Sequence, residues 1–167
     1  LQGVALDGEG RATAAMGLAV GDFDRDGWND LYKTNFYLEP NTLYRNLNGQ
    51  GFLDVSAIPK VGPASRATLG FGCEFFDADN DGWPDLFVAN GHIEDRSWSG
   101  KEDYRMRPHF FRNQRNGTFI DAAPTMGGHF TTPTLGRGVA VGDINRDGRL
   151  DLVVSEQLGR SSVLINQ

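Results

Sequence analysis

The sequence predicts an all-β fold made of β-propeller-type blades. Three observations support this fold class. An acidic nonapeptide recurs three times, strand-forming runs flank every copy, and 22 of the 167 residues are glycine, which favours many turns and short strands. We therefore expect three four-stranded repeat units, the last incomplete, in an incomplete propeller. A β-solenoid is the structural alternative, although its repeats are usually shorter.

The three copies align on the first aspartate of each acidic loop. They read GLAVGDFDRDGWNDLYKTN, GCEFFDADNDGWPDLFVAN and GVAVGDINRDGRLDLVVSE, and a glycine precedes that aspartate by five residues in each copy. Each copy then continues to an Asn-terminated run: TLYRN, HFFRN or SVLIN. In the first two copies the segments GQGFLDVS and RNGTFIDAA follow, at the turn dipeptides Asn48-Gly49 and Asn116-Gly117. Each unit thus reads strand, acidic loop, strand, turn, strand, turn, strand.

These boundaries divide one repeat domain, 1–167, into four parts. They are an N-terminal edge segment (1–16), repeat 1 (17–65), repeat 2 (66–134) and an incomplete repeat 3 (135–167). Repeat 2 is longer than the others by an insertion within 91–107. We hypothesise that residues 1–16 of one copy complement the third unit of another, because exposed strand edges invite pairing.

Composition narrows the function classes. The formal net charge is −6, which disfavours nucleic acid as a partner. No apolar run is long enough to predict a membrane span. Cys73 is the single cysteine, so an internal disulfide is excluded, and we expect it to be a small buried hydrophobe. The chain begins with Leu1, consistent either with a removed signal peptide or with a fragment.

The acidic loops follow the pattern D-x-[DN]-x-D-G-x-x-D-L and hold eleven of the 22 acidic residues. Alternate positions 1, 3 and 5 place side-chain oxygens inside a curling loop, and glycine at position 6 permits a positive φ. The carbonyl of position 7 then points inward, and position 9 supplies the last carboxylate. Such an all-oxygen donor set suits Ca²⁺, with Mg²⁺ as second choice.

The sequence therefore predicts calcium-binding hairpin loops at three Ca²⁺ sites. The candidate ligands are Asp22, Asp24, Asp26, Trp28 and Asp30; Asp77, Asp79, Asp81, Trp83 and Asp85; and Asp143, Asn145, Asp147, Arg149 and Asp151.

Other readings of the loops are weaker. An EF-hand needs glutamate at position 12 and flanking helices, whereas these copies have Lys, Val and Val there and flanks that read as strands. Zinc is disfavoured because His92, His109 and His129 lie outside the loops without ligand spacing. Acidic surface turns without metal are the remaining alternative, which three copies in register disfavour. Because Asn145 replaces a carboxylate, we expect the third site to be weaker.

The segments GDFDRDGWNDLYKTNF, NTLYRNLNGQGFLDVS and FFDADNDGWPDLFVANGH resemble FG-GAP/VCBS repeats of the ASPIC/UnbV type, a group related to cartilage acidic protein and to integrin α-subunit propellers. The resemblance implies secreted or cell-surface β-propellers of about seven blades that bind Ca²⁺ at one loop per blade.

Three functions follow as expectations. The first is a calcium-binding extracellular structural or adhesion module, either self-assembling head to tail into a ring or filament or forming part of a larger propeller. The second is a glycan- or protein-binding module that uses insertion 91–107, with Trp98 and Tyr104. The third, part of an extracellular enzyme, is disfavoured because no nucleophile elbow, Cys–His pair or phosphate loop is present. The sequon at Asn116 and the run TTPT (131–134) are candidate glycosylation sites.

Overall fold

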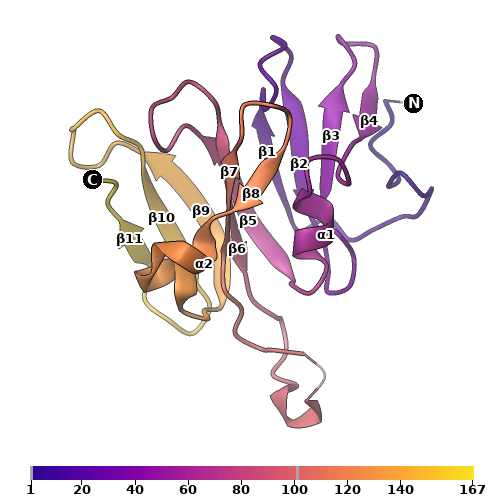
Figure 1. Cartoon of the computed structure of the whole chain (residues 1–167). Helices are drawn as coiled ribbons and strands as arrows, with labels where there is room; N and C mark the ends of the chain where they lie inside the picture. Colours follow the sequence, from indigo (N-terminus) through magenta and orange to yellow (C-terminus); the bar gives the residue numbers. More distant parts are fainter. Residues whose placement is uncertain (1, 101) are drawn as a thin grey trace.

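The computed structural model describes residues 2–100 and 102–167 and shows three antiparallel sheets side by side (Figure 1). We call them blades 1, 2 and 3. Blade 1 has strands β1 (Gly17–Gly21), β2 (Asp30–Thr34), β3 (Thr42–Asn46) and β4 (Phe52–Asp54). Blade 2 has β5 (Gly70–Phe76), β6 (Asp85–Asn90), β7 (His109–Asn113) and β8 (Phe119–Asp121). Blade 3 has β9 (Gly136–Gly142), β10 (Asp151–Glu156) and β11 (Ser162–Leu164).

This architecture confirms the predicted all-β, blade-type fold. In every blade, strands adjacent in sequence are also adjacent in the sheet. The first hairpin has the same register in each blade, with Gly21 opposite Asp30, Phe76 opposite Asp85 and Gly142 opposite Asp151. Each acidic loop therefore connects the first two strands, and its last aspartate is the first residue of the second strand.

The hydrophobic core lies between the blades. One cluster of buried side chains joins blades 1 and 2 and includes Tyr32, Leu43 and Phe111. Cys73 belongs to it, as expected for a buried hydrophobe, and burial raises the pKa of its thiol to about 12. A second cluster joins blades 2 and 3. Removing a large apolar side chain from water contributes about 1.5–3 kcal/mol, so these interfaces hold the sheets together.

The first strands of neighbouring blades approach so closely that their backbones touch. A Cβ atom added at Gly17 would lie 2.1 Å from the carbonyl oxygen of Phe71 in the next blade. A Cβ at Gly72 would lie 2.7 Å from the carbonyl oxygen of Arg137. This contact explains the glycine that stands five residues before each acidic loop in these two repeats.

Two short helices follow the fourth strands and were not predicted from the sequence. They are α1 (Val61–Ser65) after β4 and α2 (Ala123–Met126) after β8. The 3₁₀ helix η2 (Gly128–Thr131) continues α2, and η1 (Ser97–Ser99) lies in the insertion. Val61 is fully buried in the core between blades 1 and 2, so α1 closes one side of that interface.

The N-terminal segment lies against blade 1 of its own chain. The Phe52 N–H donates to the Gln2 carbonyl over 2.8 Å, and the Tyr44 hydroxyl donates to the Leu6 carbonyl over 3.1 Å. Residues 2–16 form no strand in this structure. Their pairing with the third unit of another copy stays a prediction.

The insertion 91–107 extends from the end of blade 2 opposite the acidic loops (Figure 1). The Arg137 guanidinium anchors its first residues by donating to the carbonyls of Gly91 (3.1 Å) and His92 (2.9 Å). Trp98, in η1, is 85% exposed at the far end. Among the described residues, no helix has the length and apolar character needed to cross a membrane.

Candidate metal centres

The three acidic loops have the same backbone conformation because the carboxylate at position 1 closes each of them. Asp22 accepts hydrogen bonds from the N–H groups of Asp26 (3.0 Å) and Gly27 (2.9 Å), at positions 5 and 6. Asp77 does the same in the second loop, at 2.9 and 2.7 Å. Asp143 does so in the third, at 3.1 and 3.0 Å. The first carboxylate therefore shapes the loop, and its role as a metal ligand stays a prediction.

Position 6 has the positive φ that its glycine predicts: 92° at Gly27, 85° at Gly82 and 86° at Gly148. Position 4 is also left-handed, at φ values of 57°, 55° and 63°, and this was not foreseen. The residues there are Arg25, Asn80 and Arg146, and two of the three have no special tolerance for this region. Only the structure reveals that the loop turns twice.

The aspartate at position 9 is buried in every loop. In the first, Asp30 accepts hydrogen bonds from the N–H groups of Phe23 (3.1 Å) and Asn46 (2.8 Å). Burial raises the pKa of Asp30 to about 7 and that of Asp85 to about 6. The backbone hydrogen bonds that each carboxylate accepts act in the opposite direction and lower the pKa. An ionised carboxylate at such a position requires a compensating positive charge.

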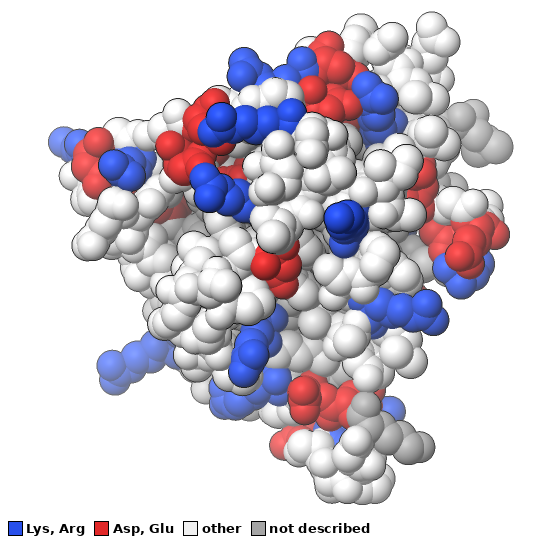
Figure 2. Space-filling view, viewed as in Figure 1, with Lys and Arg blue, Asp and Glu red and all other residues white. Residues whose placement is uncertain are grey.

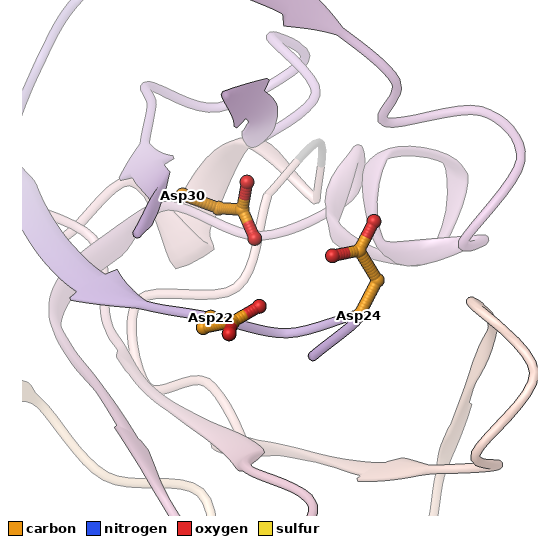
Figure 3. Close-up of side chains that lie close together, drawn as sticks. All are labelled: Asp22, Asp24 and Asp30. Carbon is orange, nitrogen blue, oxygen red and sulfur yellow. The ribbon is translucent and has the colours of Figure 1, made fainter. Parts of the chain in front are cut away.

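The carboxylates converge in the first two loops. Oxygens of Asp22, Asp24 and Asp30 lie within 4.8 Å of one another, and the three side chains face a common space (Figure 3). Asp77, Asp79 and Asp81 form a similar group, also within 4.8 Å. In the described residues, no group of three acids, histidines or cysteines meets this limit in the third loop.

The third loop differs because of the asparagine at position 3. The Asn145 amide donates to Asp147 Oδ2 over 2.8 Å, and its own Oδ1 accepts the Asp147 N–H over 3.1 Å. The backbone conformation is the same, but one carboxylate is replaced by a neutral amide. The lower affinity expected for the third site stays a prediction.

Arginines partly neutralise the first two loops. Arg45 Nε lies 2.7 Å from Asp24 Oδ2, and Arg112 Nη2 lies 2.5 Å from Asp79 Oδ2. Arg115 binds Asp81 Oδ2, also at 2.5 Å. In Figure 2 the acidic atoms along the upper edge have basic atoms beside them. The equivalent of Arg45 and Arg112 in repeat 3 is Ile165.

The arginine partners were missed in the sequence, although the repeated Arg-Asn pair of TLYRN and HFFRN was the available signal. Its asparagine also has a role that the sequence did not suggest. In each repeat the backbone N–H of this asparagine donates to the buried position-9 aspartate, at 2.8 Å for Asn46, 2.8 Å for Asn113 and 2.9 Å for Asn166.

The donor set fits a hard divalent cation. It contains oxygens and neither sulfur nor imidazole, and two loops place three carboxylates together. The position-7 residues Trp28, Trp83 and Arg149 donate their N–H groups to the position-5 aspartates over 2.9, 2.8 and 2.9 Å. Ligation through their carbonyl groups stays a prediction.

A separate buried polar chain runs through His109 in blade 2. Its Nδ1 lies 2.9 Å from Asp121 Oδ2, and its Nε2 lies 3.4 Å from the Thr68 hydroxyl. The Thr68 hydroxyl donates its proton to the Ser65 carbonyl (2.9 Å), not to the imidazole. A nucleophile needs an adjacent base that accepts its proton, so this arrangement suits a structural link between segments.

Together, the fold and the loops define a class of protein: antiparallel blades side by side, each with an acidic loop in its first hairpin, two of which bring three carboxylates together. A model of the FG-GAP-like repeat matches residues 22–88 and 97–154, and the chain belongs to this repeat family. Over 48 residues the chain is 52% identical to cartilage acidic protein 1 of Mus musculus. That match covers 28% of this chain and only 7% of the mouse protein, so it bears on a small part of the relative. FG-GAP-like repeats are typical of extracellular structural and adhesion modules.

Proposed function

We propose that this chain is a calcium-binding blade module of a secreted or cell-surface structural or adhesion protein. The observation that carries the proposal is the convergence of three carboxylates in each of two loops, within 4.8 Å. Like charges this close repel one another, and a divalent cation removes that repulsion. Calcium at these loops then stabilises the hairpins that form one end of every blade.

The residues that would hold the ion are the aspartates at positions 1, 3, 5 and 9, together with Asn145 at position 3 of the third loop. Bound Ca²⁺ would supply positive charge and fix the carboxylates. Because the folded loops bind the ion and the unfolded chain lacks the cage, the binding free energy adds to the free energy of unfolding. At an ion concentration about 100 times the Kd, one site contributes about 2.7 kcal/mol.

Calorimetric titration and thermal melting of the intact chain test this function. We expect Ca²⁺ to bind and to raise the Tm, excess chelator to lower it, and Mg²⁺ to compete poorly. Asp24→Ala and Asp79→Ala should each remove part of this response, because each substitution deletes one of the three carboxylates that converge in its loop. Asp103→Ala, at an exposed aspartate of the insertion, is the control. An identical Tm in chelator and in millimolar Ca²⁺ would refute the proposal.

Insertion 91–107 carries the second candidate function, the binding of a glycan or a protein. The supporting observation is Trp98, which is 85% exposed at the end of a segment held in place by Arg137. Tryptophan is enriched among the few residues that supply most of the binding energy at interfaces. A glycan array and an extracellular-protein panel probed with wild type and Trp98→Ala test it. Signals unaffected by the substitution would exclude the insertion as the binding site.

A further inference from the structure

We propose that two copies of this chain bind head to tail, with the outer face of blade 3 on one copy packed against β1 of blade 1 on the other. Blades 1 and 3 lie on opposite flanks of the molecule, with blade 2 between them (Figure 1). The inference goes beyond the proposed function and does not require bound calcium. It rests on contacts that the structure repeats between neighbouring blades and lacks at the two flanks.

The first repeated contact is a hydrogen bond from the asparagine after the third strand to the preceding acidic loop. The Asn113 amide of blade 2 donates to the Phe23 carbonyl of blade 1 over 2.9 Å. The Asn166 amide of blade 3 donates in the same way to the Ala78 carbonyl of blade 2 over 2.6 Å. Phe23 and Ala78 both occupy position 2 of their loops, so one geometry joins both pairs of blades.

The asparagine side-chain amide and the position-2 carbonyl are also present at the two flanks, but there they form no hydrogen bond between blades. In blade 1, the Asn46 side-chain amide donates to the Asn29 carbonyl of its own loop over 2.9 Å. The Asn113 side-chain amide makes the equivalent bond to the Pro84 carbonyl in blade 2. Within residues 2–100 and 102–167, Asn46 makes no bond to a second blade, and the Ile144 carbonyl at position 2 of the third loop accepts none. The flank of blade 1 therefore has a donor, the Asn46 side-chain amide, and the flank of blade 3 has an acceptor, the Ile144 carbonyl, for the same hydrogen bond.

The second repeated contact comes from the left-handed residue at position 4. The Arg25 guanidinium lies 5.6 Å from the centre of the Trp83 ring in the next loop. The Asn80 amide donates to the Gly148 carbonyl of the next loop over 3.3 Å. Arg146 has the same backbone conformation at the outer side of blade 3, and Trp28 occupies the receiving position in blade 1. These two residues form the matching cation–aromatic pair.

The outer faces of blades 1 and 3 also expose apolar side chains whose repeat equivalents are buried between blades. Val163 is the repeat equivalent of Leu43 and Phe110, each of which is buried against the following blade, yet Val163 is 55% exposed. Leu18 is the equivalent of Cys73, which is buried against the preceding blade, yet Leu18 is 59% exposed. Both flanks therefore present the apolar side chains that the internal interfaces bury.

The N-terminal segment restricts the contact to part of blade 1. Residues 2–13 cover Tyr44 and bind the Lys33 ammonium through the Thr13 hydroxyl at 2.8 Å, whereas Leu18 and Val20 on β1 stay exposed. The incoming blade 3 consequently packs on β1 and beside this segment. A head-to-tail pair brings six sheets together, within the four to eight blades of closed propellers, and a two-fold axis would make both contacts identical.

Sedimentation velocity of the intact chain over a range of concentrations tests the assembly. We expect a concentration-dependent dimer, which Leu18→Arg and Val163→Arg each convert to monomer. Ile120→Arg is the matched control, because Ile120 is also a strand residue 55% exposed, but it lies on the middle blade. We expect this variant to dimerise like wild type.

Mixing the two monomeric variants distinguishes head-to-tail binding from other modes. Leu18→Arg keeps an intact blade 3 flank and Val163→Arg keeps an intact blade 1 flank, so their mixture should regain association through one intact contact. A mixture that stays monomeric, a wild type that stays monomeric, or single variants that still dimerise would each overturn the proposal. Calcium titration of the same variants separates this outcome from a failure of metal binding, because neither substitution touches a loop carboxylate.

Discussion

The residue at position 3 distinguishes the three acidic loops chemically. Asp24 and Asp79 each face an arginine, whereas Asn145 is neutral and bonds to Asp147. The number of charged ligands is one of the features that set the affinity of a calcium loop. This position therefore allows one site to be changed without touching the position-1 carboxylate that holds the loop closed.

Exchanging the position-3 residues should shift two affinities in opposite directions. We expect Asp79→Asn to weaken calcium binding at the second loop about tenfold, equivalent to about 1.4 kcal/mol, and Asn145→Asp to strengthen the third by a similar factor. Isothermal titration of both variants measures the change, with Asp103→Asn as the control for an acid outside the loops. Equal affinities in the variants and the wild type would mean that position 3 is not a ligand.

The Asp121–His109 pair provides a prediction about pH. Burial alone would raise the pKa of Asp121, but the hydrogen bond and charge of His109 outweigh burial and hold this pKa below its usual value. A depressed carboxyl pKa stabilises the fold above the unfolded value of about 3.9, and this stabilisation is lost as the pH falls through the folded pKa. The pair should therefore stabilise the protein at neutral pH and not in strong acid.

We expect Asp121→Asn to lower the free energy of unfolding at pH 7 by about 1–3 kcal/mol, because buried hydrogen-bonding groups lose their charged partner. The difference from wild type should begin to shrink as the pH falls below the unfolded value of about 3.9, and it should vanish only when the pH has passed through the lower folded pKa. Urea denaturation of both proteins at pH 3 and pH 7, in chelator to silence the loops, measures it. A difference of the same size at both pH values would show that the charge of Asp121 contributes nothing.

At the scale of the elements, the close approach of the first strands determines which residues each blade can accept. Gly72→Ala would place a Cβ atom 2.7 Å from backbone atoms of blade 3, where neither strand can move independently of its sheet. We expect a loss of about 1–3 kcal/mol, the usual range for overpacking. Gly142→Ala is the matched control, since its Cβ would meet nothing within 4 Å. Equal stability of the two variants in thermal melts would contradict this packing.

Much of the blade architecture could be predicted because each repeat carries its own local signals. The acidic hairpin, the Asn-Gly turns and the β-branched runs predict β2, β6 and β10 and the strands around them. Helices α1 and α2 could not be predicted, because four or five residues show no helical period and no side chain caps their first turns. They form where the chain crosses between blades and buries Val61 or Ala123.

The candidate site was predictable in composition but not in detail. Spacing alone indicated that loop aspartates gather and where glycine must turn, and the structure brings together Asp22, Asp24 and Asp30 in one loop and Asp77, Asp79 and Asp81 in another. Spacing could not indicate that Asp30 would be buried or that Arg45 would lie across the loop, because both depend on the third strand returning beside the first hairpin. Contacts from residues distant in sequence therefore decide the electrostatics of the loops, and metal ligation by these aspartates stays a prediction.

At the scale of the whole molecule, the chain is a linear array in which blade 2 has two internal interfaces and blade 3 has one. In such arrays stability is approximately the sum of unit and nearest-neighbour terms, so equivalent substitutions should act differently along the array. Val88 in β6 and Val154 in β10 occupy the same repeat position and are both buried. They differ chiefly in which interface they fill, because Val88 packs between blades 1 and 2 and Val154 between blades 2 and 3.

Val88→Ala and Val154→Ala therefore form a matched pair, and each should cost about 2 kcal/mol in its own interface. For Val154→Ala we expect hydrogen exchange to speed up mainly in β9, β10 and β11, because blade 3 can detach while the first interface stays intact. For Val88→Ala we expect faster exchange mainly in the strands of blade 1, because the weakened interface joins blade 1 to blade 2 while the interface between blades 2 and 3 stays intact. If both variants instead sped up exchange uniformly, the three blades would unfold as a single cooperative unit rather than as an array of coupled neighbours.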